Sequence, residues 1–281
     1  MSFPVVTRDL ALRIGQSEAD HIVSWLRVLQ AYEGNPFGVE IRRFGNAVAL
    51  SNEAMSLGPL FNRVLGMDET EWDAQEEILR FYREKGIGCR IDINPYQATA
   101  GLLRSMGAAG LIPFRFHDFL YAVPSELKMA GRMSAPSDVE VCRVRREELP
   151  LWADSWRTGF TEVLGVDASL LPLLADATAH LYDAPGWSLY LALVNGVPAA
   201  TGALYIQNGI ASIAIAGTRP EFRRRGCQTA LLQARLDDAV AQDCDLVVAQ
   251  AALDAISHHN MERAGLRIAY TRAFWLQQKS E

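Results

Sequence analysis

Long apolar runs are missing from this sequence. The longest apolar stretches, residues 210–217 and 246–253, are far shorter than the roughly 20 residues that a membrane-spanning helix needs. The first residues also lack a basic stretch followed by an apolar run and a small-residue cleavage site, so a secretory signal peptide is not expected. These absences predict a protein without a membrane partner.

Cysteine is scarce, and its spacing is not that of a metal site. Cys89, Cys142, Cys227 and Cys244 form no CxxC motif and no Cys/His pattern with zinc-site spacing. We therefore expect four reduced thiols and a cytoplasmic location.

Basic charge is not in excess. The 281 residues carry 27 Lys and Arg against 33 Asp and Glu, for a net charge of -6, and 49% of them are hydrophobic. This composition is globular, with material for one large or two modest cores, and it excludes a surface built as a whole for nucleic acid. Basic clusters must be local. One such cluster exists, because Arg219, Arg223, Arg224 and Arg225 lie within seven residues. It can be interpreted either as an anion-binding site or as a solvated turn.

The segment before these arginines predicts an antiparallel meander. Residues 187–194, 199–207 and 210–216 have the composition of strands, and Asn195-Gly196 and Asn208-Gly209 between them are typical hairpin turns. The last of the three strands runs directly into the arginine cluster.

The segment after the arginines predicts a helix. From Gly226, apolar residues recur at spacings of three and four as far as Val240, with Arg235 and two aspartates between them. Residues 245–252, 255–264 and 267–276 then predict strand, helix and strand, which gives the sheet a parallel pair. Upstream, a strand at 139–144 and helices at 147–160 and 168–181 complete this half.

An internal repeat extends the pattern to the first half. Residues 109–121 resemble residues 264–276, 155 positions later, and helix, strand and helix are predicted before them at 70–85, 89–93 and 98–106, the first capped by Thr70 and Asp73. Glycine, serine and proline interrupt residues 127–137. We therefore predict a mixed α+β fold of two tandem domains, residues 1–130 and 138–281, each with a mostly antiparallel sheet flanked by helices.

A strand that enters a helix through an Arg/Gly turn suits phosphate, because the first helical N–H groups have no intrahelical partner and the macrodipole favours negative charge. Neither a GxxxxGK[ST] nor a GxGxxG motif is present. Residues 218–232 instead resemble the acetyl-CoA motif of the GNAT superfamily of N-acetyltransferases, in which Arg223 and Gly226 fit and Gln228 replaces the usual Gly or Ala. Residues 257–266 are similar to the family's helix that ends in Gly-Phe before the last strand.

The resemblance implies an acetyl-CoA-dependent N-acetyltransferase that acts on a primary amine of a small molecule, amino acid or peptide, by direct attack in a ternary complex. It also implies which residues contact acetyl-CoA. The strand end would meet the pantetheine arm with Ala216, Gly217 and Thr218. Asn260 would approach the pantetheine or thiol end. The turn would wrap the pyrophosphate with Arg223, Arg224, Arg225, Gly226, Cys227, Gln228 and Thr229.

The general acid departs from the family's pattern. Family members often place a tyrosine four residues before the glycine of Gly-Phe, where this sequence has Met261. Ser257, Tyr270 or a water are weak substitutes; Ser257 could equally cap its helix, and Tyr270 could be a packing aromatic. A transferase for a longer acyl group and a non-catalytic acyl-CoA sensor therefore stay open.

Several neighbouring residues have a functional and a plain interpretation. Glu162 and Asp167, with the aromatics Trp152, Trp156 and Phe160, lie in the segment that the resemblance assigns to the acceptor pocket, where a carboxylate would attract an amine. The acidic residues could equally be solvent-facing loop charges.

No metal is predicted. His258 and His259 adjoin on a helix and are expected to point in different directions. Cys227 is interpreted as a packing residue, although a helix N-terminus lowers thiol pKa values.

The first domain is predicted to be a degenerate repeat. Residues 63–73, which correspond to the arginine turn, are acidic where the pyrophosphate would lie, so repulsion should prevent CoA binding there. We expect this domain to pack on the second one and shape the acceptor cleft.

Overall fold

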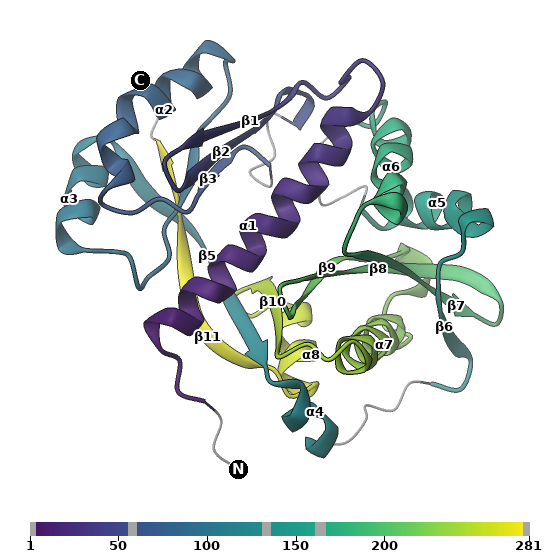
Figure 1. Ribbon diagram of the computed structural model, residues 1–281. Helices are drawn as coiled ribbons and strands as arrows, with labels where there is room; N and C mark the ends of the chain where they lie inside the picture. Colours follow the sequence, from purple (N-terminus) through teal and green to yellow (C-terminus); the bar gives the residue numbers. More distant parts are fainter. Residues whose placement is uncertain (1–3, 56–60, 131–135, 161–166, 278–281) are drawn as a thin grey trace. The chain divides into compact units, whose positions relative to one another are not determined.

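The computed structural model describes residues 4–55, 61–130, 136–160 and 167–277, so Glu162 lies outside the described residues. The chain forms two compact units (Figure 1). Among the described residues, unit 1 comprises those up to Phe119, Ala251–Leu253 and those from Ile268 onward. Unit 2 comprises Leu120–Gln250 and Asp254–Arg267.

Unit 1 is a sheet in the order β1-β2-β3-β4-β11-β5, with β3 and β4 parallel. Alternate residues of β11 face opposite sides, since Arg272 binds Glu18 of α1 while Trp275 packs with α2 and α3. The elements that lie wholly or mostly in this unit are α1 (Arg8–Ala31), β1 (Val39–Phe44), β2 (Ala47–Asn52), η1 (Glu53–Met55), β3 (Arg63–Leu65), η2 (Glu71–Ala74), α2 (Gln75–Glu84), β4 (Arg90–Asp92), α3 (Ala100–Ala108), β5 (Leu111–Ala122) and β11 (Arg267–Gln277).

Unit 2 is a sheet in the order β10-β9-β8-β7-β6, with α7 on one face and α5 and α6 on the other (Figure 1). Leu231 and Leu236 of α7 pack on Leu204 and Val247 of the sheet. The elements of this unit are α4 (Pro124–Ala130), β6 (Val139–Arg143), η3 (Arg146–Glu148), α5 (Leu149–Phe160), α6 (Leu171–Ala179), η4 (His180–Asp183), β7 (Trp187–Val194), β8 (Val197–Gln207), β9 (Ile210–Thr218), η5 (Pro220–Phe222), α7 (Cys227–Ala241), β10 (Leu246–Ala252) and α8 (Ile256–Arg263).

The predicted meander, parallel pair and α+β class are confirmed. Strands β7, β8 and β9 pair antiparallel, and β9 pairs parallel with β10. Asn195 and Asn208, each followed by glycine, adopt positive φ angles in the turns, as hairpins with two-residue loops require. The run β3–α2–β4–α3–β5 repeats the run β9–α7–β10–α8–β11, which is the tandem arrangement that the internal similarity predicts.

The unit boundaries differ from the predicted domains 1–130 and 138–281. Strand β11, which belongs to the second repeat in sequence, pairs antiparallel with β4, so that Trp275 lies opposite Ile91. Leu120 and Ala122, at the end of β5, instead pack in the core of unit 2. The physical reason is that strand pairing and core packing are long-range contacts, which a break in local composition does not report.

A buried ion network holds β11 in unit 1. Arg272 binds Glu18 at 2.7 Å and Asp92 at 3.1 Å, and Arg63 binds the same two carboxylates at 2.9 and 3.1 Å. Arg90 adds a third guanidinium, 2.6 Å from Asp92. Burial raises the pKa of Glu18, but Arg272 and Arg63 outweigh that effect and hold the pKa far below its ordinary value. The network therefore joins α1, β3, β4 and β11.

Within the described ranges, none of the helices combines the length and apolar character that crossing a bilayer demands.

Candidate functional site

The turn between β9 and α7 presents a row of unused backbone donors. Among the described residues, the N–H groups of residues 224–229 donate to no backbone acceptor, and the first such bond runs from Ala230 to the carbonyl of Gly226. Arg224 and Gly226 have φ angles of 62° and 79°. Adjacent N–H groups in such a conformation, at the start of a helix, form a concave anion site.

Gly226 is required by this geometry. It is the N-cap of α7 in the left-handed region, and a Cβ atom there would lie 2.6 Å from Cδ of Pro136. A side chain would therefore clash with Pro136 as well as strain the backbone. The sequence located the start of the helix correctly, whereas contact with Pro136, 90 residues earlier, was not visible in it.

The four arginines of the turn have different surroundings. Arg219 binds Asp154 of α5 and donates to the hydroxyl of Ser155 at 3.2 Å, and Arg225 binds Asp138 at 2.6 Å. Arg223 and Arg224 are exposed. Arg219 and Arg225 thus hold the turn in place through ion pairs, whereas Arg223 and Arg224 place two positive charges beside the N–H groups.

Strand β9 diverges from β10 just before this turn. The two pair only over residues 210–212, and β9 continues to Thr218. On its other edge β9 contains a bulge, because Ala214 pairs with Ala203 and Gly217 with Thr201, which leaves two residues of β9 opposite one of β8. Ile215 in the bulge has a φ of 44°, an unusual value for a β-branched residue. The edge of residues 213–218 can accept an extended ligand in the manner of an added strand.

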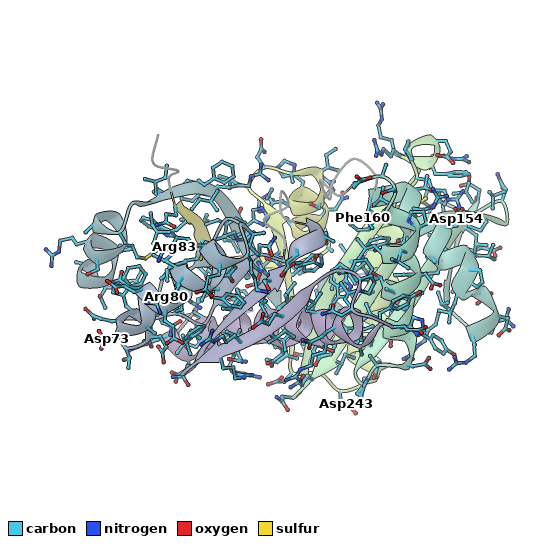
Figure 2. The ribbon with its side chains drawn as sticks, turned by 90° about the horizontal axis from the view of Figure 1, so that it is seen from above. Asp73, Arg80, Arg83, Asp154, Phe160 and Asp243 are labelled. Atoms are coloured by element: carbon cyan, nitrogen blue, oxygen red, sulfur yellow. The ribbon has the colours of Figure 1, made fainter. Side chains whose placement is uncertain are left out.

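The end of α5 covers the end of β9. Phe160, labelled in Figure 2, lies so close to Gly217 that a Cβ on Gly217 would be 2.6 Å from the ring. A Cβ on Gly159 would be 3.1 Å from the nitrogen of Thr218. Trp156 stacks on Phe160 at 5.0 Å. Trp152 and Trp156 are fully buried, so they are core residues, and Phe160 is the aromatic that reaches the strand end.

Gln228 and Cys227 have clear local roles. Nε2 of Gln228 donates to the hydroxyl of Thr218 at 2.8 Å, which ties the first turn of α7 to the strand end. An amide therefore has a use at the position where the family usually has Gly or Ala. Burial raises the pKa of Cys227, so the thiol is not activated, in agreement with its interpretation as a packing residue.

Helix α8 supplies Ser257 and Asn260. Ser257 is exposed in its first turn and does not cap it, because the N-cap is Ala255. Oδ1 of Asn260 accepts a hydrogen bond from Arg263 at 2.5 Å. Met261, in place of the family's tyrosine, packs against the core of unit 2.

The two adjacent histidines of α8 lie close to acidic side chains. His258, His259 and Glu262 bring ligand atoms within 4.8 Å of one another, so the argument that the two histidines diverge too far is wrong. His259 lies 3.2 Å from Asp254 and His258 lies 3.9 Å from Glu262, so carboxylates flank both rings. Asp167 accepts from the N–H and hydroxyl of Ser169, at 2.8 and 2.7 Å, as the cap of a turn.

Tyr270 and Ser257 lie in different units. Tyr270 is buried in unit 1, where its ring stacks on Phe119 at 4.9 Å, and burial raises the pKa of its hydroxyl. Of the two interpretations that the sequence left open, this placement favours the packing aromatic.

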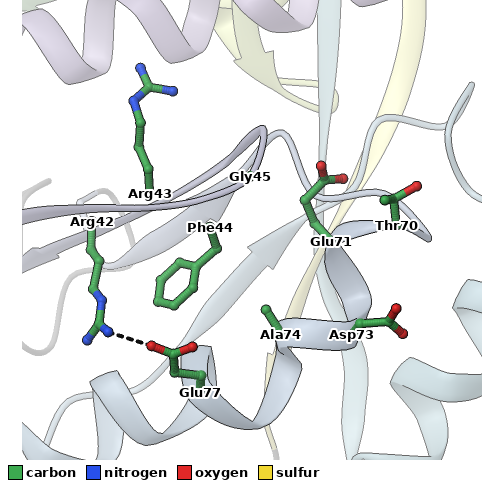
Figure 3. A pocket seen from close by; sticks show the side chains of 9 residues that line it. All are labelled: Arg42, Arg43, Phe44, Gly45, Thr70, Glu71, Asp73, Ala74 and Glu77. Carbon is green, nitrogen blue, oxygen red and sulfur yellow. Dashed lines mark hydrogen bonds and ion pairs between the residues drawn. The ribbon is translucent and has the colours of Figure 1, made fainter.

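The corresponding turn of unit 1 carries carboxylates that accept from backbone N–H groups of this turn and of the β1–β2 hairpin. Asp68 accepts from the N–H of Thr70 at 2.8 Å, and Glu71 accepts from the N–H of Asn46 at 3.2 Å. The predicted cap by Thr70 and Asp73 is wrong, because α2 begins after Ala74 and has no side-chain cap. An open pocket of about 450 Å³ beside this turn is lined by mixed charges, including Arg42 paired with Glu77 (Figure 3).

Residues 149–266 match the Acetyltransferase (GNAT) family. Among solved structures, the chain is similar to a GCN5-related N-acetyltransferase from Kribbella flavida, with 18% identity over 96% of both chains and a TM-score of 0.62. It is also similar to a tandem GNAT protein from the clavulanic acid biosynthesis pathway, with 14% identity over 94% of this chain and 97% of that one, and a TM-score of 0.61. No curated protein gives a significant match.

Residues 149–266 therefore match the GNAT acetyltransferase family and have its fold, and unit 1 resembles a second GNAT-like fold. The matched range includes β9, its bulge, the arginine turn and α8. The family supports acyl transfer from acetyl-CoA in general terms.

Proposed function

We propose that the protein is an N-acetyltransferase that transfers the acetyl group of acetyl-CoA to a primary amine of a small molecule, amino acid or peptide. The observation that carries this proposal is the row of N–H donors at residues 224–229, which have no backbone acceptor among the described residues, beside the part of β9 that continues beyond its pairing with β10. The two features match a ligand with an anionic end and an extended amide-containing arm.

In this proposal the N–H groups of residues 224–229 bind the pyrophosphate, with Arg223 and Arg224 adding positive charge. Ala216, Gly217 and Thr218 pair with the pantetheine amides, and Asn260 approaches the thiol end. Phe160 borders this strand end and would lie beside the acyl group or the acceptor.

The reaction requires a neutral amine whose nitrogen attacks the thioester carbon. The carbonyl oxygen then carries negative charge, which backbone N–H donors of the β9 bulge would stabilise. Collapse breaks the carbon–sulfur bond, and the thiolate takes up a proton while the new amide loses one. Ser257 or a water would supply the proton to sulfur, since Met261 has no proton to give.

Unit 1 has no acetyl-CoA site in this proposal. Asp68 occupies the N–H of Thr70, and the acidic surroundings of Glu69, Glu71 and Asp73 repel phosphate. Free thiols at Cys89, Cys142, Cys227 and Cys244 support a reducing, cytoplasmic location for the activity.

Calorimetric titration of acetyl-CoA tests the binding site. Arg223→Glu combined with Arg224→Glu should weaken binding by a factor on the order of ten or more, because two attractive charges become repulsive. Arg80→Glu combined with Arg83→Glu, on the exposed face of α2, makes the same change in net charge and should leave binding intact (Figure 2). If the wild type does not bind acetyl-CoA, the proposal is rejected.

A second candidate is a non-catalytic acyl-CoA sensor, which the packing of Met261 into the core favours. Release of free thiol from acetyl-CoA with a panel of amines separates the two. Sustained, amine-dependent release supports the transferase, whereas tight binding without turnover supports the sensor. Titration with acyl-CoA thioesters of increasing chain length tests the transferase for a longer acyl group.

A further inference from the structure

Arg235 of α7 is a buried cation that the helical pattern of the sequence places between apolar positions. Its side chain is only 2% exposed. Nε donates to the carbonyl of Leu231 at 2.9 Å, and Nη1 donates to the carbonyls of Ala203 at 3.4 Å and Ala214 at 3.2 Å. Burial lowers the pKa of Arg235 to about 10, so the guanidinium is still protonated at neutral pH.

The guanidinium lies directly beneath the bulge of β9. Ala203 and Ala214 are the cross-strand pair at which the bulge begins. A Cβ atom on Gly202, the residue of β8 opposite the bulge, would be 3.2 Å from Cζ of Arg235. Glycine at position 202 therefore leaves room for the cation under the strand.

This arrangement is expensive if its only purpose is packing. Among the described residues, Arg235 has no hydrogen bond or ion pair with a carboxylate, and a buried charge without an opposite charge costs far more than an apolar side chain of similar volume. Interaction with Tyr190 raises the pKa of Arg235 against the larger effect of burial, and the hydroxyl of that tyrosine donates to Asp238 at 2.5 Å. A leucine or methionine would fill the space at a lower cost.

The contact with Ala214 gives the charge a chemical use. The carbonyl of Ala214 and the N–H of Ile215 belong to one peptide group, so a cation bonded to the oxygen withdraws electrons from the nitrogen and makes its N–H a stronger donor. We propose that Arg235 is a positioning residue that fixes the β9 bulge and polarises its backbone donors toward the acyl oxygen of acetyl-CoA. This inference rests on the function proposed above.

The test compares Arg235→Met with Leu236→Ala, a buried neighbour whose loss destabilises the same helix without touching the guanidinium. The spectroscopic readout is the infrared band of acetyl-CoA labelled with carbon-13 at the thioester carbonyl. Bound to wild type, the band should shift to lower frequency. It should return toward the free position in Arg235→Met and keep its shift in Leu236→Ala.

Affinity gives a second readout. Polarisation acts on the acetyl group and not on the phosphates, so the preference for acetyl-CoA over CoA should fall by up to about tenfold in Arg235→Met, because the N–H of Ile215 remains but becomes a weaker donor. If Arg235→Met does not fold, Arg235→Lys provides the same test, because lysine keeps the charge but lacks the several N–H donors of the guanidinium. The infrared band of acetyl-CoA bound to this variant should lie between the wild-type and free positions.

Two negative outcomes are distinguishable. An unchanged band and an unchanged preference in a folded variant overturn the role of Arg235 and leave the acetyl-CoA site standing. A wild type that does not bind acetyl-CoA overturns the proposed function and this inference with it.

Discussion

Replacing Arg272 by methionine tests whether the ion network holds β11 in unit 1. Breaking a buried pair by removing one partner costs about 3–5 kcal/mol. The network has three guanidiniums and two carboxylates, so Arg272→Met leaves Arg63 and Arg90 balanced against Glu18 and Asp92. We therefore expect a loss near the lower limit, about 3 kcal/mol. Glu18→Gln leaves three cations around one carboxylate and should cost more, about 5 kcal/mol.

Hydrogen exchange measures this loss within each unit. A loss of about 3 kcal/mol corresponds to roughly 100-fold faster exchange through unit-wide opening, so peptides from α1 and β4 should respond and peptides from α7 should not. Arg146→Met removes an exposed pair with Asp183 and should change the exchange rates little. The reasoning is refuted if Arg272→Met costs no more than Arg146→Met, or if it costs more than Glu18→Gln.

Two further predictions concern acid sensitivity and the arginine turn. Burial lowers the pKa of His21 from 6.5 to about 4, so between these values the unfolded chain binds the proton and the folded chain does not; this stability is present above pH 6.5 and is lost as the pH falls toward 4. In His21→Gln, the free energy of unfolding from urea titrations should depend less on pH in this range. An unchanged pH dependence would exclude His21 as the source of the acid sensitivity. Gly226→Ala should weaken acetyl-CoA binding by a factor on the order of ten, because its Cβ meets Pro136, while Gly196→Ala, with a φ of 78° but open space, should bind normally in the same calorimetric assay.

Local signals predicted much of unit 2. Paired Asn-Gly turns located the meander, and apolar spacing with Gly226 located α7. These features depend on neighbours in sequence, since a two-residue turn and a helical stripe each involve a few consecutive residues. The anion site belongs to the same class, because its donors are consecutive N–H groups.

Long-range features were not predicted. Helix α1 buries Glu18 and His21 within its apolar stripe, which weakens the amphipathic pattern that would identify it. The sequence pattern predicts Arg235 on the polar surface of α7, whereas two of its acceptors are carbonyls of β8 and β9. Side-chain identity does not report a backbone acceptor, so neither the bulge nor its buried cation has a signal in the sequence.

The place of β11 has a consequence for how the chain matures during synthesis. The ribosome produces α1 and β1–β5 first, but the strand that lies between β4 and β5 in that sheet is made only after all of unit 2. Until then the nascent unit 1 carries an unfilled sheet position, and Glu18 and Asp92 lack one of their arginine partners, Arg272. We therefore expect unit 1, although it is made first, to need chaperone protection or to misassemble until β11 completes its sheet at the end of synthesis.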